Sequence, residues 1–360
     1  MSVARKNVYN QTFFMNFIEK MIQVYPVFPQ EEFLSYIYQD DWEGLELKQR
    51  IRRVTESLGK ALPASYPEAI QLLRKLAPQC VGFPYLFFPD YVERYGQKNW
   101  ELSMQALEEF TASSTAEFAV RPFIQQNPDK MMAQMLAWTQ HSSEHVRRLA
   151  SEGCRPKLPW ATPLTIFRQD PSAILPILEQ LNEDPSKYVQ KSVANNLNDI
   201  SKDHPDIVRE IIQKWQLQHP ITDWILRHGS RTLLKQADPI VLQMFGYLDA
   251  EAIMVTDLSL SSDQLILGDT LTFSFQVINP TGSDQKLRIE YAVDFVKANG
   301  RQNRKIFQLS DRNFADGATE VVRKQQFINL STRKHYPGRH QLTILVNGQE
   351  KASQSFELMV

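Results

Sequence analysis

The sequence predicts a mainly α-helical multidomain protein in which a HEAT-like α-α superhelix precedes an all-β sandwich of immunoglobulin type. Two observations support this. The spacing of apolar residues changes from the helical to the strand period near residue 250, and a weak repeat of about 40 residues runs through the helical part. A chain of 360 residues has room for two or three domains. We therefore expect a helical-repeat domain over residues 1–248 and an immunoglobulin-like sandwich over residues 253–360.

From about Thr12 to Leu242, apolar residues recur every three or four positions, as they do on one face of a helix. Similar segments begin at Val146, Val189 and Ile225, separated by 43 and then 36 residues. Asp-Pro and Asn-Pro pairs lie between the apolar runs, where one helix should end and the next begin. A period near 40 built from paired helices is typical of HEAT and armadillo arrays.

Beyond Glu251 the apolar residues alternate with polar ones, which indicates half-buried strands. The clearest runs are 271–277 and 287–295. Turn-forming pairs separate the strands, including Asn299-Gly300 and Asn347-Gly348. About seven short strands joined in this way predict a Greek-key sandwich.

Polar and basic residues should share one face of each repeat helix. The expected faces carry His145, Arg148 and Glu152 in the first repeat, Lys191, Asn195, Asp199 and Lys202 in the second, and Arg227, Arg231 and Lys235 in the third. Like charges at i and i+4 destabilise a helix unless an anion neutralises them. We expect a groove that binds a duplex phosphate backbone, although ordinary solvated helix faces would give the same pattern.

Overall composition says less about the function of the chain than these patterns do. The formal net charge is −1, so total charge does not indicate a nucleic-acid partner. The two cysteines lie far apart without a C-x-x-C motif, which favours a reducing compartment. The first residues lack an apolar signal-peptide core, and no run of 18 apolar residues occurs. We expect a cytoplasmic monomer.

Common catalytic motifs are missing from the sequence. It has no G-x-S-x-G, no P-loop and no G-x-G-x-x-G motif. His141 to His145 fits H-x-x-E-H, a zinc motif, but Ser142-Ser143 is typical of a helix N-cap that would separate the two imidazoles. We therefore expect no metal and no cofactor.

Four segments resemble the AlkC family of bacterial DNA alkylation repair glycosylases. They are residues 45–51 (LELKQRI), 115–124 (TAEFAVRPFI), 144–160 (EHVRRLASEGCRPKLPW) and 192–203 (SVANNLNDISKD). Together the matches extend over residues 1 to about 245, and the sandwich resembles the branch of that family with an extra immunoglobulin-like domain. Gln190-Lys191 departs from the basic pair seen at Arg147-Arg148.

The resemblance implies hydrolysis of the N-glycosidic bond of cationic bases, 3-methyladenine and 3-methylcytosine, in double-stranded DNA. It also implies that the base is not flipped out, unlike the usual strategy for chemistry on bases. A cationic base departs without a general acid, so the enzyme must stabilise positive charge on the deoxyribose and position a water molecule.

By the family pattern, Glu152 is the candidate closest to C1′, with Glu117 and Asp199 in support and Trp160 stacking on the sugar or base. The residues expected to contact DNA phosphates are Arg148 and Arg155, followed by Lys157, Lys191, Lys202, Arg227 and Arg231.

Each candidate also has a purely structural interpretation. Glu152 could only pair with Arg148 at i, i+4, and Glu117 could offset a helix dipole in a first turn. Trp160 could anchor a loop in the core, and Asp199 could brace the following turn with Lys202.

The competing function for the whole chain is a non-catalytic HEAT scaffold that binds DNA or protein. We also expect the sandwich to strengthen DNA binding, because basic residues stand near its loops: Arg301, Arg304, Lys305, Arg333 and Lys334.

Overall fold

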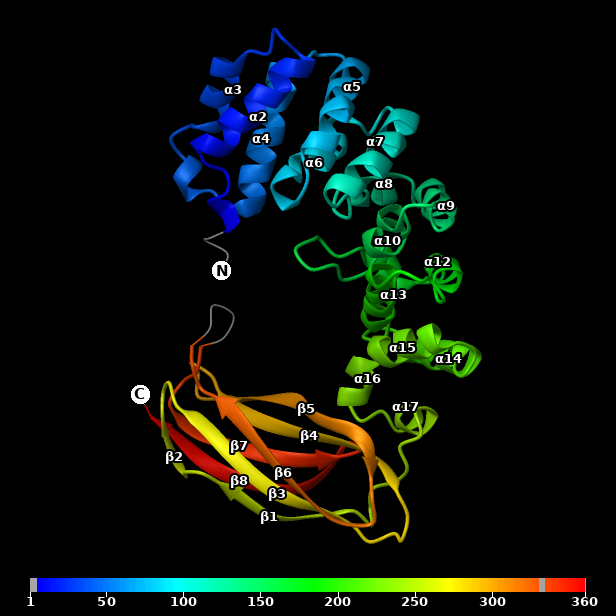
Figure 1. Cartoon of the computed structure of the whole chain (residues 1–360), viewed down its shortest axis with the longest axis vertical. Helices are drawn as coiled ribbons and strands as arrows, with labels where there is room; N and C mark the ends of the chain where they lie inside the picture. Colours follow the sequence, from blue (N-terminus) through cyan, green and yellow to red (C-terminus); the bar gives the residue numbers. More distant parts are fainter. Residues whose placement is uncertain (1–4, 330–333, 360) are drawn as a thin grey trace. The chain divides into compact units, whose positions relative to one another are not determined.

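The computed structural model describes residues 5–329 and 334–359. The chain divides into two compact units (Figure 1). One comprises Met1–His204 with Trp215–Gly229, and the other comprises Pro205–Lys214 with Ser230–Val360. Among the described residues, no helix has the length and apolar character needed to cross a membrane.

The first unit is helical. Its α-helices are α2 (Gln11–Val24), α3 (Gln30–Ile37), α4 (Leu47–Ala61), α5 (Tyr66–Leu76), α6 (Phe87–Tyr95), α7 (Trp100–Ser113), α8 (Arg121–Gln126), α9 (Pro128–Trp138), α10 (Glu144–Gly153), α11 (Thr165–Gln169), α12 (Leu175–Gln180), α13 (Lys187–Ile200) and α15 (Pro220–Gly229). Short 3-10 turns lie at Trp42–Gly44, Ala77–Gln79 and Phe83–Tyr85. The apolar stripe expected at the start of the chain is buried on α2.

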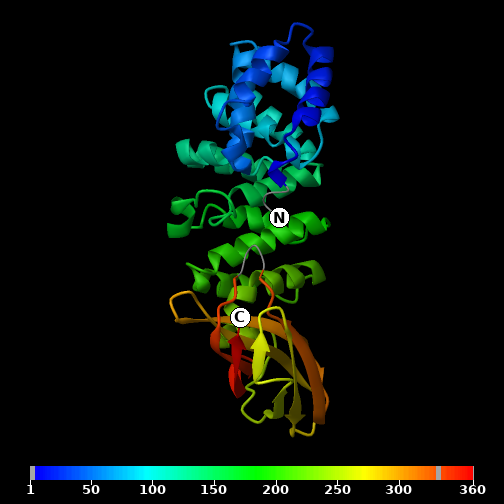
Figure 2. The same cartoon turned by 90° about the vertical axis from the view of Figure 1, so that its left-hand side faces the viewer.

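The predicted repeat is present as a row of helices. Helices α10, α13 and α15 pack against one another in chain order, and α9 and α12 pack beside them (Figures 1 and 2). Glycine permits the closest approach in this row. A Cβ on Gly229 would lie 3.0 Å from the Leu197 Cβ and 3.2 Å from the Ala194 carbonyl oxygen. The HEAT-like prediction is therefore confirmed.

Gly153, at the end of α10, has even less space around it. A Cβ there would lie 2.5 Å from the Val120 Cγ2 and 3.0 Å from the Met135 Cε. We expect Gly153→Ala to lower the free energy of unfolding by about 1–3 kcal/mol, the usual effect of overpacking a core. Urea denaturation measures it. Gly44→Ala is the matched control, because nothing lies within 4 Å of its Cβ position; equal effects of the two changes would contradict the expectation.

The second unit contains the sandwich. Its helices are α14 (Pro205–Trp215), α16 (Arg231–Lys235) and α17 (Pro239–Met244). The last residue of α14, Trp215, is assigned to the first unit. The strands of the second unit are β1 (Met254–Leu260), β2 (Gln264–Ile266), β3 (Thr270–Asn279), β4 (Gln285–Val296), β5 (Gln302–Phe314), β6 (Gly317–Gln326), β7 (Gly338–Val346) and β8 (Gln349–Met359). The change from helix to strand falls between Met244 and Met254, as the sequence predicted.

The strands form a three-stranded sheet in the order β1-β3-β6 and a five-stranded sheet in the order β2-β8-β7-β4-β5. The predicted alternation holds on β3, whose apolar residues enter the sandwich core. It does not hold on β4, where both faces are buried. Its polar residues are paired: Arg288 with Glu290 at 2.6 Å, and Asp294 with Arg304 at 2.9 Å. Asn347 and Gly348 both have positive φ angles, 47° and 82°, which a type I′ hairpin turn requires.

Candidate active site

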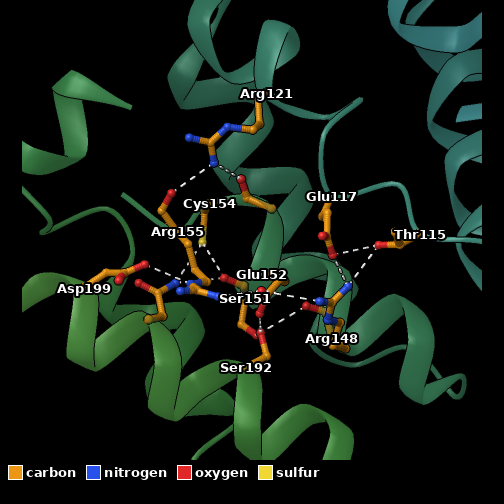
Figure 3. A network of polar contacts seen from close by, with 12 residues as sticks. Thr115, Glu117, Arg121, Arg148, Ser151, Glu152, Cys154, Arg155, Ser192 and Asp199 are labelled. Carbon is orange, nitrogen blue, oxygen red and sulfur yellow. Dashed lines mark hydrogen bonds and ion pairs between the residues drawn. The ribbon is translucent and has the colours of Figure 1, made fainter. Parts of the chain in front are cut away.

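Three carboxylates predicted as catalytic lie in one network of polar contacts in the first unit (Figure 3). Glu117 lies in the turn that precedes α8, Glu152 in the last turn of α10, and Asp199 in the last turn of α13. The packing of α10 against α13 brings together residues that are 47 positions apart in the chain. Arginine side chains join the three acids.

Glu152 is at the centre of this network and is only 5% exposed. Its Oε1 accepts from Arg155 Nη1 at 2.6 Å and pairs with Arg148 Nη2 at 3.3 Å. Its Oε2 accepts a hydrogen bond from the Ser192 hydroxyl at 2.7 Å. The expected pair with Arg148 therefore exists, but it is one of three contacts that fix both carboxylate oxygens.

Arg148 also reaches Glu117. Its Nη1 pairs with the Glu117 carboxylate and donates to the Thr115 hydroxyl at 2.9 Å, which itself donates to Glu117 at 2.8 Å. The guanidinium carbon of Arg148 lies 4.8 Å from the centre of the Tyr188 ring. Glu117 precedes the first turn of α8, so the helix-dipole interpretation of this residue is wrong.

Arg155 joins Glu152 to Asp199, since its Nε lies 2.9 Å from Asp199 Oδ2. Burial opposes the charge of Arg155, but the two carboxylates outweigh it and raise the pKa of the guanidinium. The side chain is buried among acids, not exposed as a phosphate clamp would be. Asp199 Oδ1 also pairs with Lys202 at 3.0 Å, so the predicted brace between them is present.

Next to the network, Arg121 supports the loop that follows α10 (Figure 3). Its guanidinium donates to the carbonyl oxygens of Gly153 and Arg155, both at 3.0 Å, and to that of Thr162 at 2.7 Å. Burial lowers the pKa of Arg121 to about 10. Sequence reasoning missed this residue, although an arginine inside the apolar run AVRPFI signals a buried cation with polar partners.

Trp160 lies in this loop and is 61% exposed, so it does not anchor the core. Its backbone has a φ of 66°, which is uncommon for a residue other than glycine. Its carbonyl oxygen accepts a hydrogen bond from Lys48 of α4. The indole is thus held at the surface, where it can stack on a partner.

The network can stabilise developing positive charge. It contains three carboxylates and three cations, the latter being Arg148, Arg155 and Lys202, and the acids are desolvated and fixed in place. Carboxylates in such a setting stabilise an oxocarbenium-like transition state more strongly than they would in water. Within residues 5–329 and 334–359, no group of three or more His, Cys, Asp or Glu side chains is arranged to hold a metal ion.

Comparisons with known proteins decide the family. A family model described as DNA alkylation repair enzyme matches residues 88–233, and one described as the C-terminal Ig-like domain of uncharacterised protein YhaZ matches residues 254–360. Uncharacterised YhaZ of Bacillus subtilis (strain 168) is 48% identical over 354 residues, which cover 98% of this chain and 99% of YhaZ. Pseudomonas fluorescens alkylpurine DNA glycosylase AlkC, solved bound to DNA containing an abasic site analogue, is 40% identical with a TM-score of 0.95, and 99% of each chain is covered. The chain belongs to the AlkC family. Its sandwich places it in the branch with an immunoglobulin-like domain.

The AlkC-like segments supply the whole network: 115–124 provides Glu117 and Arg121, 144–160 provides Arg148, Glu152 and Arg155, and 192–203 provides Ser192 and Asp199. Among the weaker candidates in these segments, Lys157 pairs with Asp203 at 2.8 Å, and Asp203 also pairs with Arg168 at 3.1 Å.

Two expectations about helix faces are wrong. On the predicted polar face of the second repeat, Asp199 is buried and only 1% exposed, whereas Lys191 and Lys202 are exposed as expected and Asn195 is half-buried. The row of Arg227, Arg231 and Lys235 is not on one helix, because α15 ends at Gly229 and α16 begins at Arg231. The argument from like charges at i, i+4 therefore does not apply to Arg227 and Arg231.

The structure also shows the surroundings of the H-x-x-E-H segment and of the basic residues in the sandwich. His141 precedes α10 and accepts from the Ser143 backbone N–H at 3.0 Å, whereas His145 packs against Tyr188. The Ser143 side chain makes no capping hydrogen bond, although the helix does begin after it. In the sandwich, Arg304 pairs with Asp294 and Glu350, and Arg333 lies outside the described residues.

Proposed function

We propose that this AlkC-family chain is a monofunctional DNA glycosylase of base excision repair. It hydrolyses the N-glycosidic bond of cationic alkylated bases, 3-methyladenine and 3-methylcytosine, in double-stranded DNA and leaves an abasic site. It acts as a monomer in the bacterial cytosol, and the base is not flipped out of the duplex before cleavage. The observation that supports the proposal is the buried network joining Glu117, Glu152 and Asp199.

The chemistry follows from the charge of the lesion. When the bond between C1′ and the ring nitrogen breaks, the electron pair goes to the base, which leaves neutral, and positive charge develops on the deoxyribose. Glu152 stabilises that charge and accepts a proton from the water molecule whose oxygen bonds to C1′. Glu117 and Asp199 add to the negative field. No general acid is needed, and the mechanism uses no lysine, so the DNA strand stays intact.

DNA binding would free the acids for this role. In the network each carboxylate shares its charge with a cation, and Arg148 is held by Glu117 and Glu152 together. A DNA phosphate would compete for Arg148 and expose both carboxylates to the lesion. Arg155, buried between Glu152 and Asp199, keeps those acids in position instead of binding phosphate. Lys157, Lys191, Lys202, Arg227 and Arg231 remain our candidates for further phosphate contacts.

Cleavage without base flipping suits the position of Trp160. An exposed indole can stack on the deoxyribose or on the edge of a base that stays within the duplex, whereas a flipped base requires a side chain inside a closed pocket. We also propose that the chain has two domains. Residues 1–248 form the helical domain that binds DNA and catalyses the reaction, and residues 253–360 form the immunoglobulin-like sandwich.

The proposal is tested by incubating the whole protein with methylated duplex DNA and assaying released bases and strand breaks. We expect free 3-methyladenine and 3-methylcytosine, one abasic site for each base released, and no strand breaks. If DNA binds and no base is released at enzyme excess, the non-catalytic HEAT scaffold becomes the better interpretation.

Trp160→Ala is expected to lower the excision rate roughly 10- to 100-fold, because stacking of a base on an aromatic side chain contributes about 1–3 kcal/mol. Since the indole is exposed, the thermal midpoint should not change. Single-turnover kinetics and circular dichroism measure the two effects. Trp160→Phe keeps an aromatic ring and should recover most of the rate; an equally slow Phe variant would argue against stacking.

A further inference from the structure

A cleft of about 400 Å³ opens next to the carboxylate network within the first unit. The residues on its walls that matter most are Lys48 and Arg52 of α4, Asp90 and Glu93 of α6, Phe118, and Trp160. Thr115 belongs to both places, because it lines the cleft and its hydroxyl is bonded to Arg148 and Glu117. The volume lies in the range of about 300–1,000 Å³ that small-molecule sites occupy.

The charges in the cleft are balanced, which argues against a phosphate as its occupant. Arg52 Nη2 lies 3.0 Å from Asp90 Oδ1 and 2.5 Å from Glu93 Oε1. A phosphate would have to displace these carboxylates and overcome their repulsion. An uncharged molecule can bind without displacing the two carboxylates and is not repelled by them.

The polar and apolar parts of the cleft suit a flat molecule with a hydrogen-bond donor on its edge. The carboxylates of Asp90 and Glu93 lie on the wall of the cleft, where their side chains are 16% and 20% exposed. Burial raises the pKa of the Asp90 carboxyl to about 6, so a hydrogen-bond donor in the cleft would stabilise the ionised carboxylate. Leu86, Pro89 and Phe118 provide apolar surface in the same cleft. The Lys48 ammonium lies 4.4 Å from the centre of the Phe118 ring and donates to the Trp160 carbonyl, so it bridges α4 and the active-site loop.

We propose that this cleft takes up the free alkylated base after the glycosidic bond has broken. The base is then neutral, has apolar faces, and carries an exocyclic amino group that can donate to the carboxylates on the cleft wall, Asp90 and Glu93. The inference rests on the proposed function and adds to it a product site separate from the carboxylates. Because that site is separate, binding of the free base to the protein is measurable without DNA.

The experiment is calorimetric titration of the whole protein, without DNA, with free 3-methyladenine. We expect saturable binding at one site. Leu86→Trp, which fills the cleft, and Asp90→Asn, which removes an anionic acceptor, should each raise the Kd at least 10-fold. 3-Methylhypoxanthine, which lacks the amino group, should bind the native protein at least 10-fold more weakly. Leu136→Trp on α9 and Glu109→Gln on α7 are matched controls outside the cleft and should leave the Kd unchanged.

Single-turnover excision by Leu86→Trp completes the test, after its fold is checked by thermal denaturation. A native excision rate together with the raised Kd supports entry of the base after cleavage. A rate reduced in parallel with affinity would overturn that order, because the base would then enter while still attached. Absence of saturable binding, or equal Kd values for native and cleft variants, overturns the inference while leaving excision intact. Base binding without excision would instead count against the proposed function.

Discussion

Glu152→Gln lowers the rate of base excision at least about 100-fold and leaves DNA affinity within a few-fold of the native value. This is the largest effect that we expect on catalysis. The change removes one preorganised negative charge, a loss that typically costs a factor of about 10²–10³. The fold should survive, because Ser192 can still donate to the amide oxygen and because Arg148 and Arg155 keep Glu117 and Asp199 as partners.

The rate is measured under single-turnover conditions on duplex DNA that contains 3-methyladenine, and affinity on the same duplex with an abasic-site analogue. Glu144→Gln is the matched control, since Glu144 is an exposed residue at the other end of the same helix. A near-native rate for Glu152→Gln would move the main catalytic role to Glu117 or Asp199.

Arg155→Met has the largest expected effect on stability. It should lower the free energy of unfolding by about 3–5 kcal/mol, because it leaves Glu152 and Asp199 buried without the cation that joins them. Tryptophan fluorescence during urea denaturation reports on unfolding of the first unit, which contains Arg155, since all six tryptophans belong to that unit.

Arg168→Met supplies the comparison for that experiment. Arg168 pairs with Asp203, but its side chain is 44% exposed, so its loss should leave the midpoint of urea denaturation close to the native value. If the two variants unfolded at the same urea concentration, Arg155 would not be required to compensate the buried acids, and its assignment as a positioning residue would fail.

The fold could be predicted because both of its periods are local properties of the sequence. The alternation along β3 and the apolar stripe on α2 each depend on neighbours a few positions away, and both are observed. The burial of both faces of β4 could not be predicted in the same way. It depends on what packs against that strand from distant parts of the chain.

The acids of the candidate site were predictable, and so were the pairs Arg148–Glu152 and Lys202–Asp199, but the burial of Arg155 between two acids was not. Family resemblance pointed to Glu117, Glu152 and Asp199, and the structure brings them together. A sequence does not show whether an arginine faces solvent or a carboxylate 44 positions away, as Arg155 faces Asp199. The break between Arg227 and Arg231 has one signal in the sequence, Gly229, which the prediction of a single helix through Lys235 did not use.

The cleft beside the site was not predictable for a related reason. Its key residues, Lys48, Asp90, Phe118 and Trp160, come from four separate segments, and no local motif connects them. Only the packing of α4 against α6 and the position of the Trp160 loop place them around one space.

The central claim, that this chain excises cationic alkylated bases by means of its buried carboxylate network, is tested most directly by one measurement. It is the single-turnover release of 3-methyladenine from duplex DNA by the native protein and by a variant carrying Glu117→Gln, Glu152→Gln and Asp199→Asn, compared at equal occupancy of the DNA. We predict release by the native protein and only background release by the variant. Native release at or below background, or a variant that keeps the native rate, would contradict the account.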